Sequence, residues 1–505
     1  MTTTPDLAAG DAGADTPARG GDGVWSPQRR RLTLGLVLTI TLVAFESLAI
    51  STVMPVVKDD LGGLGLYGWV FSGFFLGSLF GIVVAGRSAD ARGTAFPFTV
   101  GLLLFSAGLL IGGLAPSMGV LVGARVLQGI GAGAIPAVAY TSVGRAYPPH
   151  LRPRVFAVFS SAWVIPGLIG PAASGAIEHA LSWRAVFLAL LPFVVLAGAM
   201  TIPQLSRSAP PTPAAGDPDT AWTAPGRLAR LGALDRRLLA IALIAGTAAV
   251  LAATNGPPVA LAVALVAVGA PLAVVAFVQL VPPGTLRLAA GMPAAVMVRG
   301  ILTFAFFGTD AYVSLTFQDV RDQATWVAGA ALTAATVAWT AGAWTQERLV
   351  ARVGPRRLIA TGFTCIVVGI GGMFGALGPL PVPVAIVIWG VAGFGTGLSY
   401  APLSVTVLGL AEPGREGAAS SSLQLSDVLG TALGTGASGA FVALEEGGSW
   451  TLTTALAAAF ALTTAVAVVG ILAARRLPSA LPDAAALDDP AAVEPGAFGA
   501  SAGQH

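Results

Sequence analysis

The chain has 505 residues, of which 55% are hydrophobic and only 10% are charged. Soluble globular proteins carry about 25% charged residues, so this composition excludes a soluble protein and indicates one that crosses a membrane many times. The net charge of +2 offers no basic surface for nucleic acid. The single cysteine, Cys365, excludes an intramolecular disulfide framework.

The chain begins with a polar segment rich in glycine, alanine and aspartate. It lacks the basic and then apolar pattern of a cleavable signal peptide, so we expect a disordered cytoplasmic tail over 1–31. Fourteen apolar runs of helix length follow, and about 20 such residues suffice to cross a bilayer. The predicted spans are 33–57, 67–86, 96–115, 118–143, 154–178, 183–203, 237–254, 258–281, 293–317, 325–345, 357–377, 383–409, 418–443 and 451–474.

Two glycine-rich motifs recur along the chain at one interval. The motif GIGAGA begins at Gly129 in the fourth span, and GFGTGL begins 264 positions later at Gly393 in the twelfth. The motif GPAASGA begins at Gly170, and GTGASGA begins at Gly434, which is the same interval. Agreement on one shift indicates that the first six spans and the last six are repeats of one another.

The repeat predicts two six-helix bundles, over 32–204 and 292–476. Between them, 205–291 is read as a cytoplasmic linker followed by two inserted helices, and 477–505 as a cytoplasmic tail. The expected fold is therefore an all-α integral membrane protein with 14 transmembrane helices. Parallel repeats of this kind build transporters that rock around a central site.

The basic residues predict how the chain sits in the membrane. With the N-terminus inside, most of the 27 lysines and arginines fall in the tails and in the connections on the cytoplasmic side. An even number of spans then places both termini in the cytoplasm. We expect a multi-pass protein of the cell (cytoplasmic) membrane.

Glu46 is an acid in the middle of an apolar span. It follows Thr33 by 13 positions, so it lies roughly 20 Å along the helix at about 1.5 Å per residue. A carboxylate at that depth costs several kcal/mol if ionised, so it is usually protonated, paired or facing water. The repeat interval takes Glu46 to Asp310 in the ninth span, which gives the second bundle a matching acid.

The segment 86–93, GRSADARG, resembles the first signature of the major facilitator superfamily. Gly86, Asp90 and Gly93 have the spacing of that signature, with Arg87 and Arg92 beside the acid. The basic pair that usually follows the last glycine is absent. The resemblance implies a conformational switch loop between the second and third spans.

The fourth span carries a second signature of the same family in Arg125, Gln128 and Gly129. An arginine inside a membrane helix must find an anion or water. The resemblance implies that Arg125 takes part in proton coupling. In the first span, 45–55 resembles a signature in which an aspartate usually stands nine residues before a proline. This chain has Glu46 in that place, so the carboxylate is kept but lengthened.

The fifth span resembles the pattern that marks antiporters within the superfamily. Its residues are Gly167, Gly170, Pro171 and Gly175, in the segment PGLIGPAASG. Glycines let neighbouring backbones approach closely, and proline permits a bend. Over 32–476 the chain is similar to superfamily transporters of the fourteen-helix drug–proton antiporter type.

Other polar and aromatic residues are candidates to line a substrate cavity. They are Asp427, Gln424, Trp163, Phe307 and Tyr312. Arg299, in the ninth span, is expected to extend toward the cytoplasmic interface. The three histidines are dispersed and no phosphate-binding glycine loop occurs, so we expect no metal, no cofactor and no transport driven by ATP.

These features predict a proton-coupled secondary active transporter that exports hydrophobic or amphipathic small molecules, cationic ones among them. Protons, the substrate and the lipid bilayer are its expected partners, and a monomer is expected. Either carboxylate can take the proton, with Asp310 favoured if Arg125 holds Glu46 ionised. The alternative is an exporter or flippase of a lipid or endogenous metabolite. A membrane enzyme or sensor would show clustered catalytic residues or a soluble domain, and neither is found.

Overall fold

The computed structural model describes residues 23–62, 66–207, 236–253, 259–446 and 450–480. This part of the chain consists of α-helices with short 3-10 and π turns, and contains no strand. Most of the predicted N-terminal tail, most of the linker and nearly all of the C-terminal tail lie outside the described residues.

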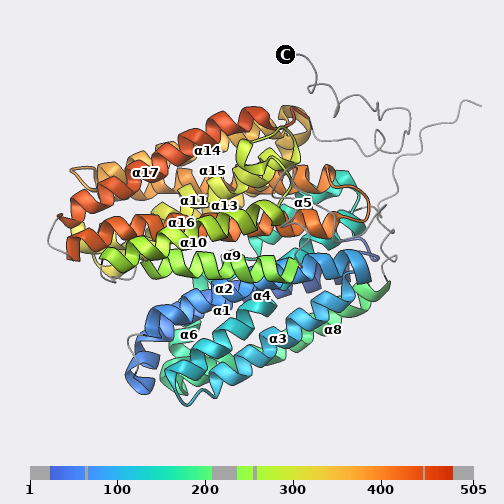
Figure 1. The fold of residues 1–505 in the computed structure, drawn as a ribbon, viewed down its shortest axis with the longest axis horizontal. Helices are drawn as coiled ribbons and strands as arrows, with labels where there is room; N and C mark the ends of the chain where they lie inside the picture. The colour runs from blue at the N-terminus through green and yellow to red at the C-terminus, as the bar shows by residue number, and fades with distance from the viewer. Residues whose placement is uncertain (1–22, 63–65, 208–235, 254–258, 447–449, 481–505) are drawn as a thin grey trace, which may run out of the picture.

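The first half of the chain forms the lower bundle in Figure 1, except that its segment labelled α5 lies higher, against helices of the second half. Its helices are α1 (Arg30–Leu61), α2 (Tyr67–Arg92), α3 (Ala95–Gly113), α4 (Met118–Ala146), α5 (Arg152–Ser161), α6 (Val164–Ala180), α7 (Trp183–Leu188) and α8 (Leu191–Arg207). Two helices, α9 (Arg236–Ala253) and α10 (Val259–Leu280), then pack as a pair in front of both halves in that view.

The second half forms the upper bundle. Its helices are α11 (Met292–Asp310), α12 (Val313–Leu315), α13 (Thr325–Val353), α14 (Pro355–Ala376), α15 (Val382–Gly409), α16 (Glu416–Glu446) and α17 (Leu452–Ala473). A π turn over Thr316–Val320 follows α12. The all-α membrane architecture predicted from the apolar runs is confirmed.

Within the described residues, 12 helical segments are long and apolar enough to cross a membrane. The two predicted spans outside that set are the seventh and the thirteenth, which fold as α9 and α16. Helix α16 is 31 residues long, and serines, threonines and an aspartate lower its hydropathy. Several of these polar side chains are buried between helices, which is how a polar helix is accommodated in an apolar protein.

Two predicted spans are broken rather than continuous. The fifth divides into α5 and α6, because Pro166 has no N–H to donate to the carbonyl of Ala162 one turn earlier. The hydroxyl of Thr41 on α1 donates to that carbonyl instead, at 3.2 Å. The ninth span ends as α11 at Asp310 and restarts as α12 at Val313.

The glycines of the repeat hold equivalent helix pairs together. A Cβ on Gly129 would lie 2.1 Å from the carbonyl oxygen of Phe74, so α4 packs directly on α2 there. A Cβ on Gly393 would lie 2.1 Å from the carbonyl oxygen of Ala335, which packs α15 on α13 in the same way. The two halves therefore make equivalent close contacts through glycines that are 264 residues apart, at carbonyls that are 261 residues apart.

Candidate functional site

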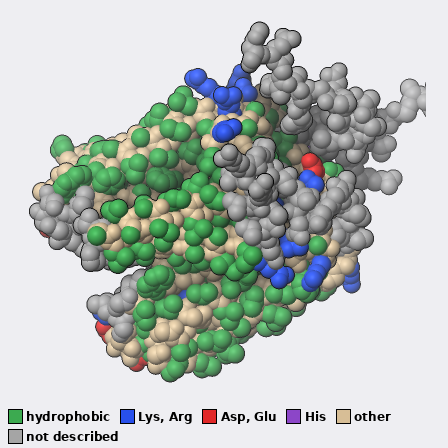
Figure 2. All heavy atoms as spheres, in the orientation of Figure 1, with side chains coloured by type: hydrophobic (Ala, Val, Ile, Leu, Met, Phe, Trp, Pro, Cys, Tyr) green, Lys and Arg blue, Asp and Glu red, His purple; other side chains and the backbone are tan. Residues whose placement is uncertain are grey.

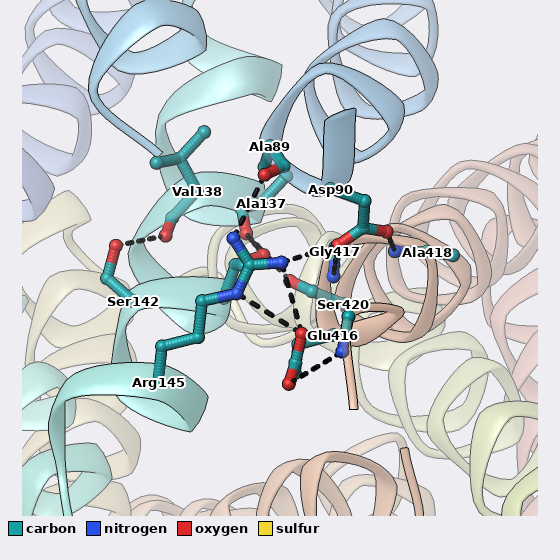
Figure 3. Close-up of polar contacts among 12 residues, drawn as sticks. Ala89, Asp90, Ala137, Val138, Ser142, Arg145, Glu416, Gly417, Ala418 and Ser420 are labelled. Atoms are coloured by element: carbon teal, nitrogen blue, oxygen red, sulfur yellow. Dashed lines mark hydrogen bonds and ion pairs between the residues drawn. The ribbon is translucent and has the colours of Figure 1, made fainter. Parts of the chain in front are cut away.

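Asp90, near the end of α2, joins the two bundles. Its carboxylate accepts the backbone N–H of Gly417 at 2.7 Å and that of Ala418 at 2.8 Å, in the first turn of α16. Arg145 on α4 donates to Asp90 at 2.8 Å and to Glu416 at 3.1 Å (Figure 3). Because the first N–H groups of a helix have no partner within it and carry partial positive charge, a carboxylate there is favourable.

The backbones of α2 and α16 approach each other closely beside this network. A Cβ on Gly417 would lie 2.3 Å from the carbonyl oxygen of Gly86, and a Cβ on Gly86 would lie 2.6 Å from that of Gly417. Two serines of α16 add hydrogen bonds to the first bundle. Ser420 donates to the carbonyl of Ala137 and Ser421 to that of Ile82, each at 2.8 Å.

The predicted switch loop is helical. Nothing interrupts α2 before Gly93, whose φ of +80° ends the helix, so Gly86, Arg87, Asp90 and Arg92 all belong to α2. Arg92 lies over the ring of Phe96 at 5.0 Å and does not bridge the bundles. The interpretation as a loop was wrong.

Arg145 and Glu416 are the members of this network that sequence reasoning missed. Arg145 resembled any arginine at the cytoplasmic end of a span. Glu416 carried one signal, because it opens α16 and acids are favoured in the first turn of a helix. Neither residue lies near Asp90 in the sequence, so only the tertiary structure shows the connection.

We call the end of the molecule at which α2, α4 and α13 finish the basic end, and the opposite end the far end. On α13, Trp344 donates to Ser161 at 2.9 Å and Gln346 to the carbonyl of Pro153 at 3.2 Å, again in the half nearer the basic end. At the far end the surface is hollowed between the two bundles, on the left in Figure 2. The structure is thus closed at the basic end and open at the far end.

Glu46 and Arg125 form a buried ion pair within the first bundle. Both side chains are at most 3% exposed. The guanidinium also donates to Gln128 at 2.8 Å and to the carbonyl of Val70 at 3.2 Å, and it lies 4.3 Å from the ring centre of Phe74. The structure thus brings together two residues that the family resemblance singled out.

Asp310 ends α11 and lies beside the indole of Trp389. Trp389 stands 264 positions after Arg125, so a neutral indole occupies the place that the repeat assigns to the arginine. Among the described residues no lysine or arginine is paired with Asp310, a residue that is intermediate in exposure. The two matching acids therefore differ in charge environment, since one has a cation and the other does not.

The predicted antiporter segment lies on α6 beside α1. Gly167, Gly170, Pro171 and Gly175 are all helical. A Cβ on Gly170 would be in ordinary contact with Leu48 of α1 at 3.7 Å, and nothing lies within 4 Å of one on Gly175. A Cβ on Gly167 would meet Thr336 of α13 at 3.4 Å, so this face of α6 reaches the second bundle.

Arg299 does not extend to the interface, and that expectation was wrong. Its side chain is fully buried and donates to Asp427 through Nε at 2.8 Å. The hydroxyl of Tyr400 donates to the other carboxylate oxygen at 2.9 Å. An arginine and an acid inside membrane helices are each costly alone, which is why they pair.

The remaining cavity candidates differ in exposure. Trp163, at the break between α5 and α6, is 44% exposed, whereas Gln424 is buried. Tyr312 donates to the carbonyl of Thr435 at 2.9 Å, which ties the break after α11 to α16. Phe307 is partly exposed and packs against Trp339, with ring centres 6.1 Å apart.

Comparison with known proteins decides the family. The profile of the Major Facilitator Superfamily matches residues 36–345, which is more than half of the chain. The chain belongs to this superfamily. It is therefore a membrane transporter and not an enzyme, as the apolar runs and signatures predicted.

Bacterial relatives carry multidrug names. A probable multidrug-efflux transporter of Mycobacterium tuberculosis (strain ATCC 25618 / H37Rv) is 27% identical over 475 residues, covering 89% of this chain and 96% of the relative. A multidrug transporter protein of Bacillus subtilis (strain 168) is 31% identical over 170 residues, covering 34% of this chain. That match spans 31% of the Bacillus protein's own length.

Solved structures share the fold at low identity. A human organic anion transporter superposes with a TM-score of 0.65 at 14% identity, covering 89% of this chain and 99% of its own. A proton:xylose symporter of the superfamily superposes with a TM-score of 0.62, also at 14% identity, covering 88% and 94%. These likenesses show that the arrangement of helices is the superfamily fold.

Proposed function

We propose that the protein is a proton-coupled exporter of hydrophobic or amphipathic small molecules, organic cations among them, working by alternating access. The observation that carries the proposal is the unequal pairing of Glu46 and Asp310. The first acid has a buried arginine beside it and the second has a tryptophan. The efflux names of the bacterial relatives support export of drug-like molecules.

In this proposal the two acids have different tasks. Arg125 compensates the charge of Glu46, and the pair holds α1 against α4. Asp310 has no such cation among the described residues, so its charge is the one that a proton or a cationic substrate compensates. Competition between the two for Asp310 couples their fluxes.

The network around Asp90 supplies the other requirement of alternating access, which is a contact that must break when the molecule opens at the basic end. Separating the bundles there removes the cap from α16 and the partners of Arg145. Such contacts stabilise one of two rigid arrangements rather than a continuum.

The topology that accompanies this function has fourteen crossings, with α9 and α16 included. Helix α9 pairs with α10 through close backbone contact, since a Cβ on Gly246 would lie 2.6 Å from the carbonyl oxygen of Gly269. We further propose that both termini face the cytoplasm and that the protein works as a monomer in the cell (cytoplasmic) membrane.

Transport into vesicles under an imposed pH gradient tests the proposal. Asp310→Asn should abolish the acceleration by the gradient, and the exposed variant Asp59→Asn should retain it. If the double variant Glu46→Gln with Asp310→Asn kept gradient-driven transport unchanged, the carboxylate mechanism would be ruled out. If the protein transported one lipid selectively and none of several unrelated dyes, the result would favour an exporter of lipids or metabolites.

A further inference from the structure

The guanidinium of Arg299 occupies a cation site made by the protein's own side chains. Its central carbon lies 3.0 Å from the ring centre of Tyr400, and its Nε donates to Asp427 at 2.8 Å. An aromatic face combined with a carboxylate is the arrangement with which proteins bind organic cations. Arg299 is therefore placed where the positive group of a ligand would otherwise bind.

The site is filled and electrically balanced. Arg299 is fully buried, and its Nη1 donates to the carbonyl of Tyr400 at 2.6 Å and to Ser404 at 3.4 Å. Its Nη2 is buried with no hydrogen-bond partner among the described residues. Asp427 is 17% exposed and both of its oxygens accept hydrogen bonds, so the pair has no net charge.

The pair stands outside the repeat. The positions 264 residues before Arg299 and Asp427 are Gly35 and Trp163, neither of which is charged. The first bundle contributes a neutral group instead, because Tyr140 on α4 lies beside Tyr400 and Arg299. The repeat that relates Glu46 to Asp310 therefore does not explain why this pair is present.

A row of aromatic rings connects this pair to Asp310. Trp389 stacks on Phe306 at 5.3 Å, Phe306 meets Trp339 at 5.5 Å, and Trp339 meets Tyr400 at 5.2 Å between ring centres. Trp339 and Tyr400 are partly exposed. Trp389 and Phe306 are buried, so the row joins an acid without a cation to an acid already neutralised partly through the core of the second bundle.

We propose that Arg299 is a built-in cation that sets how many positive charges a substrate can carry. By occupying the carboxylate–aromatic site at Asp427, it leaves Asp310 as the place for a single cationic centre and excludes a second. This inference rests on the function proposed above, and it names the charge class of the substrate as monovalent or neutral.

Equilibrium binding of two dyes to the purified full-length protein in lipid nanodiscs tests the inference without any pH gradient. Ethidium and propidium share a planar aromatic ring system but carry one and two positive charges. Wild type should bind ethidium more tightly than propidium. Arg299→Leu should raise the affinity for propidium relative to ethidium by about tenfold, because it frees the carboxylate of Asp427.

Two matched variants complete the test. Arg184→Leu removes an arginine paired with Asp60 away from the site and should leave the ratio of the two affinities unchanged. Arg299→Leu combined with Asp427→Leu removes both charges and should return the ratio to that of wild type. Replacing both partners of a buried pair by apolar residues is often tolerated, so this variant serves even if the single one does not fold.

Two results would overturn the inference. One is a folded Arg299→Leu protein with an unchanged ratio of affinities. The other is a loss of ethidium affinity of about tenfold or more in the double variant, since that would show Asp427 already binding the substrate's charge. If wild type binds neither dye, the substrate class proposed above fails, whereas a gain of propidium binding in Arg299→Leu still supports the filled site.

Discussion

Asp90 caps a helix of the opposite bundle at Gly417. The hydrogen bond from the Gly417 N–H is 2.7 Å long and joins residues 327 positions apart in the chain. Because α2 and α16 belong to different halves, this contact exists only while the bundles are together at the basic end (Figure 3).

Asp90→Asn should favour the arrangement open at the basic end. Hydrogen bonds to a charged acceptor contribute about 1.5–3 kcal/mol, compared with about 1 kcal/mol for neutral ones, so losing the charge should increase the open population by about tenfold. A cysteine in place of Ser420, which is fully buried, reports that opening through its rate of reaction with a polar maleimide. Cys365→Ala provides the background without other thiols.

Asp59→Asn is the control for this prediction. Asp59 is exposed and paired with Lys58, so its loss should leave the labelling rate at Ser420→Cys unchanged. An Asp90→Asn protein that labels no faster than the control would show that the cap does not hold the basic end closed.

Gly417→Ala should separate the bundles at the same place by a different route. The added methyl would lie 2.3 Å from the carbonyl oxygen of Gly86 and 2.7 Å from a carboxylate oxygen of Asp90, so the backbones must move apart. Alanine raises helix propensity by up to about 1 kcal/mol, so faster labelling of Ser420→Cys can come only from the clash. Gly119→Ala, with nothing within 4 Å, should change nothing.

Glu46→Gln should destabilise the protein more than removal of both partners does. It leaves Arg125 buried and unpaired, which costs about 3–5 kcal/mol. Glu46→Gln with Arg125→Gln removes both charges and should recover most of that loss. Unfolding in SDS monitored by circular dichroism measures the three free energies. Equal losses in the single and double variants would mean that the pair adds nothing beyond packing.

The connection between α1 and α7 predicts a dependence on acid pH. Asp60 accepts the indole N–H of Trp183 at 3.0 Å and a guanidinium N–H of Arg184 at 2.8 Å. These two donors hold the pKa of Asp60 below its usual value of 3.8. The stability they confer is therefore complete above that value and is lost as the pH falls through the lower pKa of the folded protein.

Melting temperatures of wild type and Asp60→Asn measure this effect. Their difference should be constant above about pH 5 and should shrink in more acidic buffer. Trp183→Phe keeps an aromatic ring but removes the indole N–H donor. The pH-dependent part of its melting temperature should therefore be smaller than that of wild type. A difference that grows on acidification would contradict the sign of the pKa shift.

The sequence alone predicted the all-α membrane class, the approximate limits of most helices and the family. The length of an apolar run is set by the thickness of the bilayer, so it can be read along the chain without knowing any contact. The repeat placed Glu46 and Asp310 in matching positions for the same reason, since equal spacing is a property of the chain.

Tertiary structure alone decided which charges meet. The partners in the ion pairs Arg145–Glu416 and Arg299–Asp427 lie more than a hundred residues apart in the chain. Their pairing therefore depends on how helices from distant segments cross. The carbonyl of Ala162, which the break in the fifth span leaves without its helical partner, is likewise satisfied only in the folded protein, by the hydroxyl of Thr41. Hydropathy indicates how apolar a helix is, but it does not indicate which side chain a buried charge will contact.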